Sequence, residues 1–332
     1  MLFNDKLRNA SRTKFFALAA LAFGSVFSNP ALAEDTWPNG PVQLYVPAAP
    51  GGGTDAVARI LAERLQQEKG SPFVVVNLPA GSGVVAAEQV RNAAPDGQTL
   101  LFFHSGIMTS YHTGVYQHDP VHEFTSVGLM PVEGSYSLAV PEDAPYNNLA
   151  DFVAAAKEKP NKLSIGVALR GSTHFMGGLL ASASGAEFRF VEAGSDAEKL
   201  VQLQGKQIDA ALINTANTKQ YVDSKLLKVL GTISGSPERD PLMPDVPTMV
   251  EQGYKDALYG FDFMVLGPKD MDPALVTSIH DAFSAAAGDP AIAEKLKTFG
   301  MPLQALDQAD IAAKLEETDK KIGDTAAALG LN

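Results

Sequence analysis

The chain has no cysteine among its 332 residues. This absence excludes disulfides, thiolate nucleophiles and cysteine-ligated metal sites. It is also compatible with an oxidising compartment, because nothing in the chain can misoxidise there. Basic residues are outnumbered, since 26 Lys and Arg face 38 Asp and Glu and the formal net charge is −12. Phosphate backbones need a basic surface, so we expect no nucleic-acid partner.

The motifs of several common enzyme classes are also absent. The sequence has no G-x-x-x-x-G-K-[ST] phosphate loop, no G-x-S-x-G nucleophile elbow and no H-E-x-x-H zinc helix. Residues 81–86 match a G-x-G-x-x-A dinucleotide fingerprint. However, the Asn-Leu-Pro-Ala segment before them makes the turn longer than that fingerprint allows. We therefore expect neither catalysis nor a cofactor.

Four histidines, His104, His112, His118 and His122, lie within 19 residues of one another. Their spacing matches no common set of zinc ligands. The segment around them is predicted to be loop-like, and solvated or turn-capping roles are favoured for them. We therefore expect no metal site.

Long hydrophobic runs are scarce too, and the longest lies close to the beginning of the chain. The 13 apolar residues 15–27 follow four basic residues and precede Ala31-Leu32-Ala33. A basic segment, a short apolar segment and a small-residue end are typical of a secretory signal peptide, and the run is too short to span a membrane. We predict a signal peptide over 1–33 that is cleaved after Ala33 on the general secretory pathway. The expected location is the bacterial periplasm.

Strand-like and helix-like segments alternate through the rest of the chain. Strands are predicted at 42–46, 73–76, 99–103, 137–140, 163–167, 188–191, 208–213 and 227–233. Helices are predicted from 54, at 84–93, at 149–157, from 174 through 181, at 197–203, and two or three times after 273. This alternation predicts an α/β fold with open, largely parallel sheets. Ligands of such sheets sit beyond the carboxyl ends of strands.

A glycine-rich loop, Pro50-Gly51-Gly52-Gly53-Thr54-Asp55, connects the strand at 42–46 to the helix that follows. Glycines let the backbone approach a ligand closely, and a helix N-terminus offers free N–H groups to an anion. The loop is therefore predicted to bind an anion. Asp55 falls in the first helical turn, where the helix dipole stabilises it. Three roles are open for Asp55. It is simply an acidic residue at the helix N-terminus, it orients the loop, or it binds an amine of the ligand.

Five stretches of the chain, in order, resemble the substrate-binding receptors of tripartite tricarboxylate transporters, also called Bug receptors. They are 46–55 followed by Arg59, then 75–83, 94–101 and 205–210, and last Arg239 with 244–248 and 251–253. The resemblance implies a type II periplasmic-binding-protein fold, with two α/β domains and a ligand cleft between them. The domains would take 35–135 with 258–332, and 136–257, with a hinge near 131–137 and 258–265.

The resemblance also implies a function. The protein would be a periplasmic solute-binding receptor that captures a small organic anion, a carboxylate or related acid. It would deliver this ligand to a large and a small integral membrane subunit of a transporter, and it would act as a monomer. Two alternatives stay open: a receptor that presents its ligand to a membrane kinase, and an exported hydrolase that uses Ser105 or Ser172.

Receptors of this family hold a carboxylate with backbone amides of two loops. The matching residues here are Pro50, Gly51, Gly52, Gly53, Thr54 and Asp55, and Ala80, Gly81, Ser82 and Gly83. Ser105 and Gly171, Ser172, Thr173 and His174 would complete the site.

The chain departs from the family in two places. Val191-Glu192-Ala193-Gly194 replaces the common Pro-Tyr-Lys-Gly, and Arg170 stands where small residues are usual. Arg170 and Glu192 either select a zwitterion or hydroxylated acid, or pair with each other. His174 either donates to the ligand or caps its helix.

Overall fold

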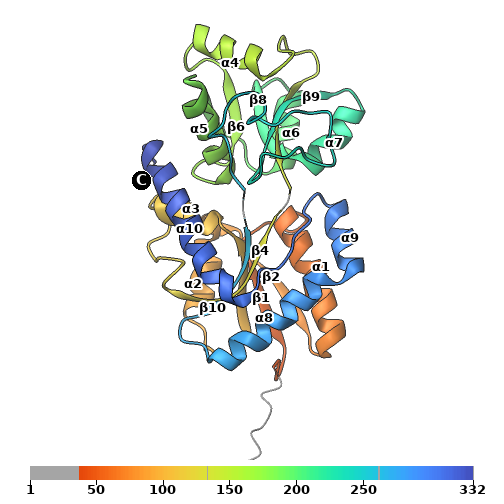
Figure 1. Ribbon diagram of the computed structural model, residues 1–332, viewed down its shortest axis with the longest axis vertical. Coiled ribbons are helices and arrows are strands. Elements are labelled where there is room, and N and C mark those ends of the chain that lie inside the picture. Colours follow the sequence, from red (N-terminus) through yellow and green to blue (C-terminus); the bar gives the residue numbers. More distant parts are fainter. Residues whose placement is uncertain (1–36, 133, 261, 332) are drawn as a thin grey trace, which may run out of the picture. The chain divides into compact units, whose positions relative to one another are not determined.

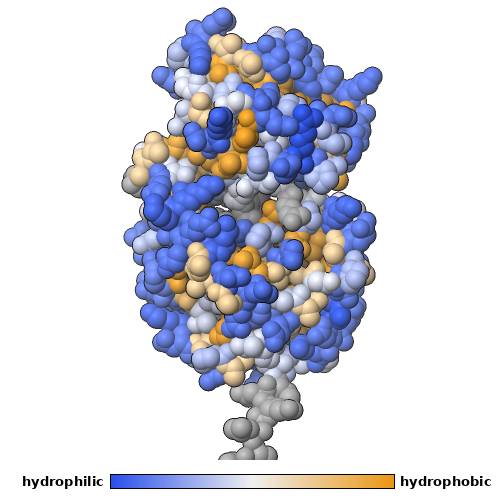
Figure 2. Space-filling model, viewed as in Figure 1, coloured by the Kyte–Doolittle hydropathy of each residue, from blue (hydrophilic) through white to orange (hydrophobic). Residues whose placement is uncertain are grey.

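The computed structural model describes residues 37–332 except 133, 261 and 332 (Figure 1). The predicted signal peptide, 1–33, lies outside the described residues, so it stays a prediction. None of the described helices combines the length and apolarity needed to cross a membrane. Figure 2 shows that hydrophilic residues cover most of the visible face, with apolar residues in smaller patches.

The first sheet has the strand order β2-β1-β3-β10-β4. Its strands are β1 (Val42–Val46), β2 (Phe73–Asn77), β3 (Thr99–His104), β4 (Phe124–Pro131) and β10 (Asp262–Pro268). β1 pairs in parallel with β2 and β3, whereas β10 pairs antiparallel with β3 and β4. Val42, Leu44 and Val46 of β1 are fully buried and alternate with more exposed residues, which explains why this strand was predicted from its pattern.

Seven helical elements accompany the first sheet (Figure 1). They are α1 (Gly53–Lys69), the 3-10 helix η1 (Ala80–Gly83), α2 (Val84–Arg91), α3 (Gly106–His112), α8 (Pro273–Gly288), α9 (Pro290–Thr298) and α10 (Gln308–Ala328). α1 buries Val57, Leu61 and Leu65 on one side and ends at Gly70, whose φ of 70° suits glycine. α1 packs on β2, α8 packs on β4, and α10 packs on both α3 and β4.

The second sheet has the strand order β7-β6-β8-β5-β9. Its strands are β5 (Tyr136–Pro141), β6 (Ser164–Val167), β7 (Arg189–Glu192), β8 (Ala210–Asn214) and β9 (Leu227–Ile233). β6 pairs in parallel with β7 and β8, and β5 pairs antiparallel with β8 and β9. The helices are α4 (Leu149–Glu158), α5 (Ser172–Ser184), α6 (Asp196–Gln204) and α7 (Thr215–Asp223).

The predicted α/β class is confirmed, and three helices follow Pro273 as the sequence predicted. Each sheet is largely parallel but holds one antiparallel strand, β10 or β5. These two strands directly follow the passages between the sheets, from β4 to β5 and from β9 to β10. The domain boundaries proposed from the sequence stay a prediction.

The prediction of a loop-like histidine segment is wrong in part, because His104 ends β3 and His112 lies on α3. The pattern also did not reveal β4, β10 or α7. α7 buries only Thr215 and Thr218, so its sequence carries no apolar stripe.

Candidate functional site

The first predicted binding loop, residues 50–55, lies between β1 and α1 and includes the first turn of α1. Gly51 has a φ of 81°, in the left-handed region that favours glycine. Gly52 precedes the helix, and no side-chain group caps it. A Cβ on Gly53 would collide with Cε of Met301. The loop therefore needs glycine at 51 for its backbone conformation and at 53 for lack of space. It also leaves the N-terminus of α1 without a side-chain cap.

Asp55 holds this loop in place. Its Oδ2 accepts hydrogen bonds from the backbone N–H of Gly51 at 2.9 Å and from Nε of Arg59 at 3.0 Å. Its Oδ1 accepts from Nδ2 of Asn77 at 2.8 Å. The same amide donates to the carbonyl of Ala48 at 3.0 Å, and Oδ1 of Asn77 accepts from Arg59 at 2.9 Å. The network ties the first loop to the end of β2.

These contacts also explain the ionisation of Asp55. The residue is only 3% exposed, and burial by itself would raise its pKa. Hydrogen bonds from Arg59, Gly51 and Asn77 outweigh burial and hold the pKa below its usual value. Of the roles that the sequence left open, these contacts favour loop orientation, because protein donors already occupy both carboxylate oxygens.

The second predicted loop, 78–83, packs against the first. Leu78 N donates to the carbonyl of Val46 at 2.9 Å. Ala80–Gly83 forms η1, in which Gly81 and Gly83 have φ values of 66° and 97°. A Cβ on Gly83 would lie 2.9 Å from Phe103 and 3.2 Å from Pro47. The ends of β1, β2 and β3 therefore meet around these glycines. The side chain of Ser82 lies outside the described part of the structure.

Ser105 follows β3 and precedes α3. Its N–H donates to the carbonyl of Asp262 at 3.0 Å, and its hydroxyl accepts from the N–H of Asp262 at 3.4 Å. Nδ1 of His104 accepts from the N–H of Gly106 at 2.9 Å, which places any proton of the neutral ring on Nε2. Burial lowers the pKa of His104 to about 4, so the ring is neutral at physiological pH. His104 is a residue of this region that the sequence did not single out as a binding candidate.

The predicted segment 170–174 lies between β6 and α5 and includes the first turn of α5. Thr173 is 6% exposed, and its Oγ1 accepts from the N–H of Ala168 at 2.8 Å. Nδ1 of His174 accepts from the N–H of Arg170 at 3.0 Å, and the ring packs edge-on against Phe190 with centroids 4.9 Å apart. Burial lowers the pKa of His174. Both side chains therefore shape the turn before α5.

Glu192 and Arg170 do not form an ion pair within the described residues. Oε2 of Glu192 accepts from the N–H of Leu169 at 2.8 Å, and Oε1 accepts from the N–H of Gly194 at 2.9 Å. Arg170 is exposed and has a φ of 62°. Glu192 thus joins two loops at the ends of β6 and β7 and is not paired with Arg170 in this structure.

Tyr259 brings two predicted segments together, although the sequence did not identify it. Its hydroxyl lies 3.1 Å from Oγ1 of Thr109 on α3 and donates to Oγ of Ser172 at 3.5 Å. A Cβ on Gly106 would lie 3.6 Å from Oγ of Ser172. The region after β3 and the start of α5 are therefore neighbours, and Tyr259 connects them.

The segment after α9 is a further neighbour of the first loop. Met301 covers Gly53, and a Cβ on Gly300, whose φ is 64°, would collide with Ala216 at the start of α7. Val132 and Leu303 form an isolated bridge. The only sequence signal for this segment is the break between helices, so its position near the binding loops could not be predicted.

Three further histidines lie close to carboxylates of different residues. His112 Nε2 lies 2.8 Å from Asp319 on α10, and His122 Nδ1 lies 2.9 Å from Asp119. His118 lies 3.7 Å from Glu88. Within the part of the chain that the structure describes, no group of three potential metal ligands occurs.

Comparisons with known proteins show which family this chain resembles. The family described as "Tripartite tricarboxylate transporter family receptor" matches residues 57–331. A relative in Agrobacterium vitis, named as a UPF0065 protein in the TAR-I ttuE-ttuC' intergenic region, is 30% identical over 89% of this chain and 85% of its own length. Protein BugT of Bordetella pertussis is 26% identical over 87% of this chain and 89% of its own length.

Solved structures agree with this assignment. The periplasmic binding protein BugD is 28% identical with a TM-score of 0.77, over 89% of this chain and 99% of BugD. An R. palustris protein solved with adipate is 26% identical with a TM-score of 0.79, over 89% of this chain and 98% of that protein. These likenesses confirm the periplasmic-binding fold predicted from the sequence. The chain belongs to the family of tripartite tricarboxylate transporter receptors.

Proposed function

We propose that this receptor binds a small organic carboxylate through the backbone of residues 50–54 and 80–83. The first loop leaves the N-terminus of α1 uncapped, and the Asp55 network holds it beside the second loop. Pro50 has no N–H, and the N–H groups of Gly51 and Gly52 donate within the protein, to Asp55 and to the carbonyl of Ala49. Gly53 and Thr54 therefore supply the N–H donors of the first loop. Preset N–H groups form strong, directional hydrogen bonds to an anion, and the helix dipole adds to the attraction. The uncapped, glycine-lined start of α1 is the observation that carries the proposal.

One relative supports this ligand class. An R. palustris protein of the same fold, 26% identical to this chain, was solved with adipate, a dicarboxylate. The first loop contains no side-chain cation, since Pro50, the three glycines and Thr54 are all neutral. Recognition by backbone N–H groups therefore suits a carboxylate, whose two oxygens accept several hydrogen bonds.

The remaining predicted residues have different roles in the proposal. Asp55 and Thr173 position backbone and do not contact the ligand. Ser105, Ser172 and His174 border the ligand from the ends of β3 and β6. Arg170 is free of ion pairs in the described residues, and it binds a second acidic group if the ligand has one.

We further propose the setting in which the receptor acts. The exported protein, cleaved after Ala33, is a periplasmic monomer that closes two domains over its ligand and presents it to a large and a small membrane subunit. Water exclusion on closure strengthens the hydrogen bonds to the carboxylate. A gene neighbourhood with two integral transporter subunits supports transport, whereas a neighbouring sensor kinase supports the sensing alternative.

A thermal-shift screen of the exported protein tests the ligand class. Adipate serves as the dicarboxylate probe and adipamide as its uncharged control. A ligand at 100 times its dissociation constant adds about 2.7 kcal/mol of stability. We expect organic acids to raise the melting temperature and adipamide to leave it unchanged. If no organic acid shifts the transition, the proposal fails, and if an acid or its ester is converted to product, the hydrolase alternative replaces it.

A further inference from the structure

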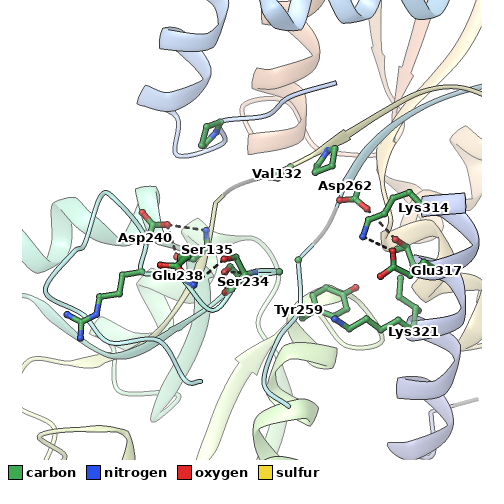
Figure 3. Close-up of a pocket in the computed structure, with 18 of the residues that line it drawn as sticks. Val132, Ser135, Ser234, Glu238, Asp240, Tyr259, Asp262, Lys314, Glu317 and Lys321 are labelled. Atoms are coloured by element: carbon green, nitrogen blue, oxygen red, sulfur yellow. Dashed lines mark hydrogen bonds and ion pairs between the residues drawn. The ribbon is translucent and has the colours of Figure 1, made fainter. Parts of the chain in front are cut away.

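A cavity of about 640 Å³ lies where the chain passes between the two sheets (Figure 3). Its walls come from the end of β4, the segment after β9, the start of β10, the segment after α9 and the middle of α10. This volume is in the range of pockets that hold small molecules. None of the residues predicted to bind the carboxylate lines it.

The strand order places this cavity beside the predicted carboxylate site, and the backbone of Asp262, in the cavity wall, exchanges hydrogen bonds with Ser105. The predicted loops follow β1, β2, β3 and β6, whereas the cavity lies at the ends of β4 and β9. β10 separates β3 from β4 in one sheet, and β5 separates β8 from β9 in the other. Tyr259 touches both regions, because it lines the cavity while its hydroxyl contacts Thr109 and Ser172.

Most charged groups in the cavity wall have protein partners. Lys314 pairs with Glu317 at 3.2 Å, and Arg239 pairs with Glu251 at 2.9 Å, outside the cavity lining. Asp240 accepts from the hydroxyl of Ser135 at 2.7 Å. Glu238 is exposed and lies across the cavity from α10, on the same side as Ser135 and Asp240 (Figure 3).

Asp262 and Lys321 differ from these groups. The carboxylate of Asp262 accepts one long hydrogen bond, 3.4 Å from Oγ1 of Thr318. Nζ of Lys321 has no hydrogen-bond or ion-pair partner among the described residues. The two side chains carry opposite charges on the same side of the cavity but do not form an ion pair (Figure 3). Burial raises the pKa of Asp262, while nearby Lys314 and Lys321 lower it. An additional cationic partner would offset the unfavourable burial of this carboxylate.

We propose that this cavity is a second binding site, for a small zwitterionic solute. The ammonium group of the solute pairs with Asp262, and its carboxylate pairs with Lys321. A molecule that carries both charges gives each of the two side chains an oppositely charged partner. A simple acid would pair only with Lys321, and a simple amine only with Asp262. Charge-assisted hydrogen bonds at both ends then fix its orientation.

Calorimetric titration of the exported protein with 4-aminobutyrate tests the proposal. Butyrate and butylamine carry one charge each and serve as matched probes. The test variants are Asp262→Asn and Lys321→Gln. The control is Lys320→Gln, because Lys320 is the adjacent lysine on α10, pairs with Asp324 and does not line the cavity. Gly52→Leu alters the first loop, so it shows whether 4-aminobutyrate binds at the proposed carboxylate site and not in the cavity.

We expect 4-aminobutyrate to bind at least tenfold more tightly than either probe with one charge. Both test variants should lose at least tenfold in affinity, while Lys320→Gln and Gly52→Leu retain it. Lys321 is exposed, so Lys321→Gln keeps the proposal testable even if Asp262→Asn fails to fold. The proposal is overturned if 4-aminobutyrate does not bind, or if Gly52→Leu abolishes its binding while Lys321→Gln does not. Adipate binding to Lys321→Gln reports separately on the proposed carboxylate site.

Discussion

Asn77 Nδ2 donates a 2.8 Å hydrogen bond to Oδ1 of Asp55, and this bond connects the end of β2 to the first turn of α1. The two segments that it connects carry the two loops predicted to hold the carboxylate. Loop conformation is thereby set by side chains that need not touch the ligand. Pre-organisation of this kind reduces the entropy that binding would otherwise have to overcome.

Asp55→Ala should lower both stability and ligand affinity. The change leaves the N–H of Gly51 and the amide of Asn77 without their acceptor, and a buried unsatisfied group costs about 1–3 kcal/mol. We expect the free energy of unfolding to fall by about 2 kcal/mol, measured by urea denaturation. Glu63→Ala is the control, because Glu63 is an exposed acid on the same helix. An equal effect of both changes would contradict the role assigned to Asp55.

The ionisation of two histidines should differ when followed by NMR. Burial lowers the pKa of His104 to about 4, whereas Asp119 raises the pKa of exposed His122 above 6.5. As the pH falls from 8 to 5, the ring signals of His122 should shift while those of His104 stay constant. Titration of His104 near pH 6.5 would contradict its buried, neutral state.

The same shift predicts a pH dependence of stability. His104 has a lower pKa in the folded state than the ordinary value of about 6.5, so the unfolded state binds its proton first as the pH falls. The contribution of neutral His104 to stability is complete above pH 6.5 and is lost between about 6.5 and 4. His104→Gln should show a smaller loss of unfolding free energy over this interval than the wild-type protein.

Gly178→Ala should destabilise the contact between α5 and the end of α10. A Cβ on Gly178 would collide with Cδ1 of Leu329, so the leucine must move. The colliding atoms are the end of a half-buried side chain that can rotate, so we expect a loss at the low end of the range for overpacking, about 1 kcal/mol. The double variant Gly178→Ala/Leu329→Ala should recover part of the loss in thermal denaturation. Gly288→Ala is the control, because nothing lies within 4 Å of a Cβ there. Additive effects of the two changes would argue against direct contact.

Tyr259→Phe tests the link between α3 and α5. The change removes the hydroxyl that contacts Thr109 and Ser172, and Thr109 is fully buried. We expect a loss of about 1 kcal/mol in unfolding free energy and weaker adipate binding. Tyr45→Phe removes a hydroxyl whose bond to Gln43 is exposed, so it should change neither. Unchanged adipate affinity in Tyr259→Phe would show that this link does not shape the binding site.

Local patterns in the sequence account for much of this fold. β1 alternates buried and exposed residues, and α1 presents Val57, Leu61 and Leu65 at helical spacing, so both were predictable. α3 has only seven residues and buries five of them in succession, so it shows no helical period. β10 is antiparallel because the chain returns from the other sheet, which is a property of topology that no local pattern contains.

The candidate site divides in a similar way. The glycines at 51–53, 81 and 83 could be identified because their chemistry is local. The partners of Asp55 could not, since Asn77 lies 22 residues away and meets it through the pairing of β1 with β2. Tyr259 and Met301 reach the site from segments more than 150 residues beyond the first loop, so only the folded structure identifies them.

Calorimetric titration of adipate into Gly52→Leu tests the central claim most directly. Gly52 has an ordinary φ of −76°, and a Cβ there would lie 3.3 Å from the carbonyl oxygen of Ala49. This contact is tight, so the carbonyl has to shift by a few tenths of an ångström, and a leucine there obstructs the start of α1. Gly288→Leu, at an exposed and open position, is the matched control. We predict that Gly52→Leu folds but loses adipate binding while Gly288→Leu keeps it. Unaltered affinity in a folded Gly52→Leu protein would show that this loop does not bind the carboxylate.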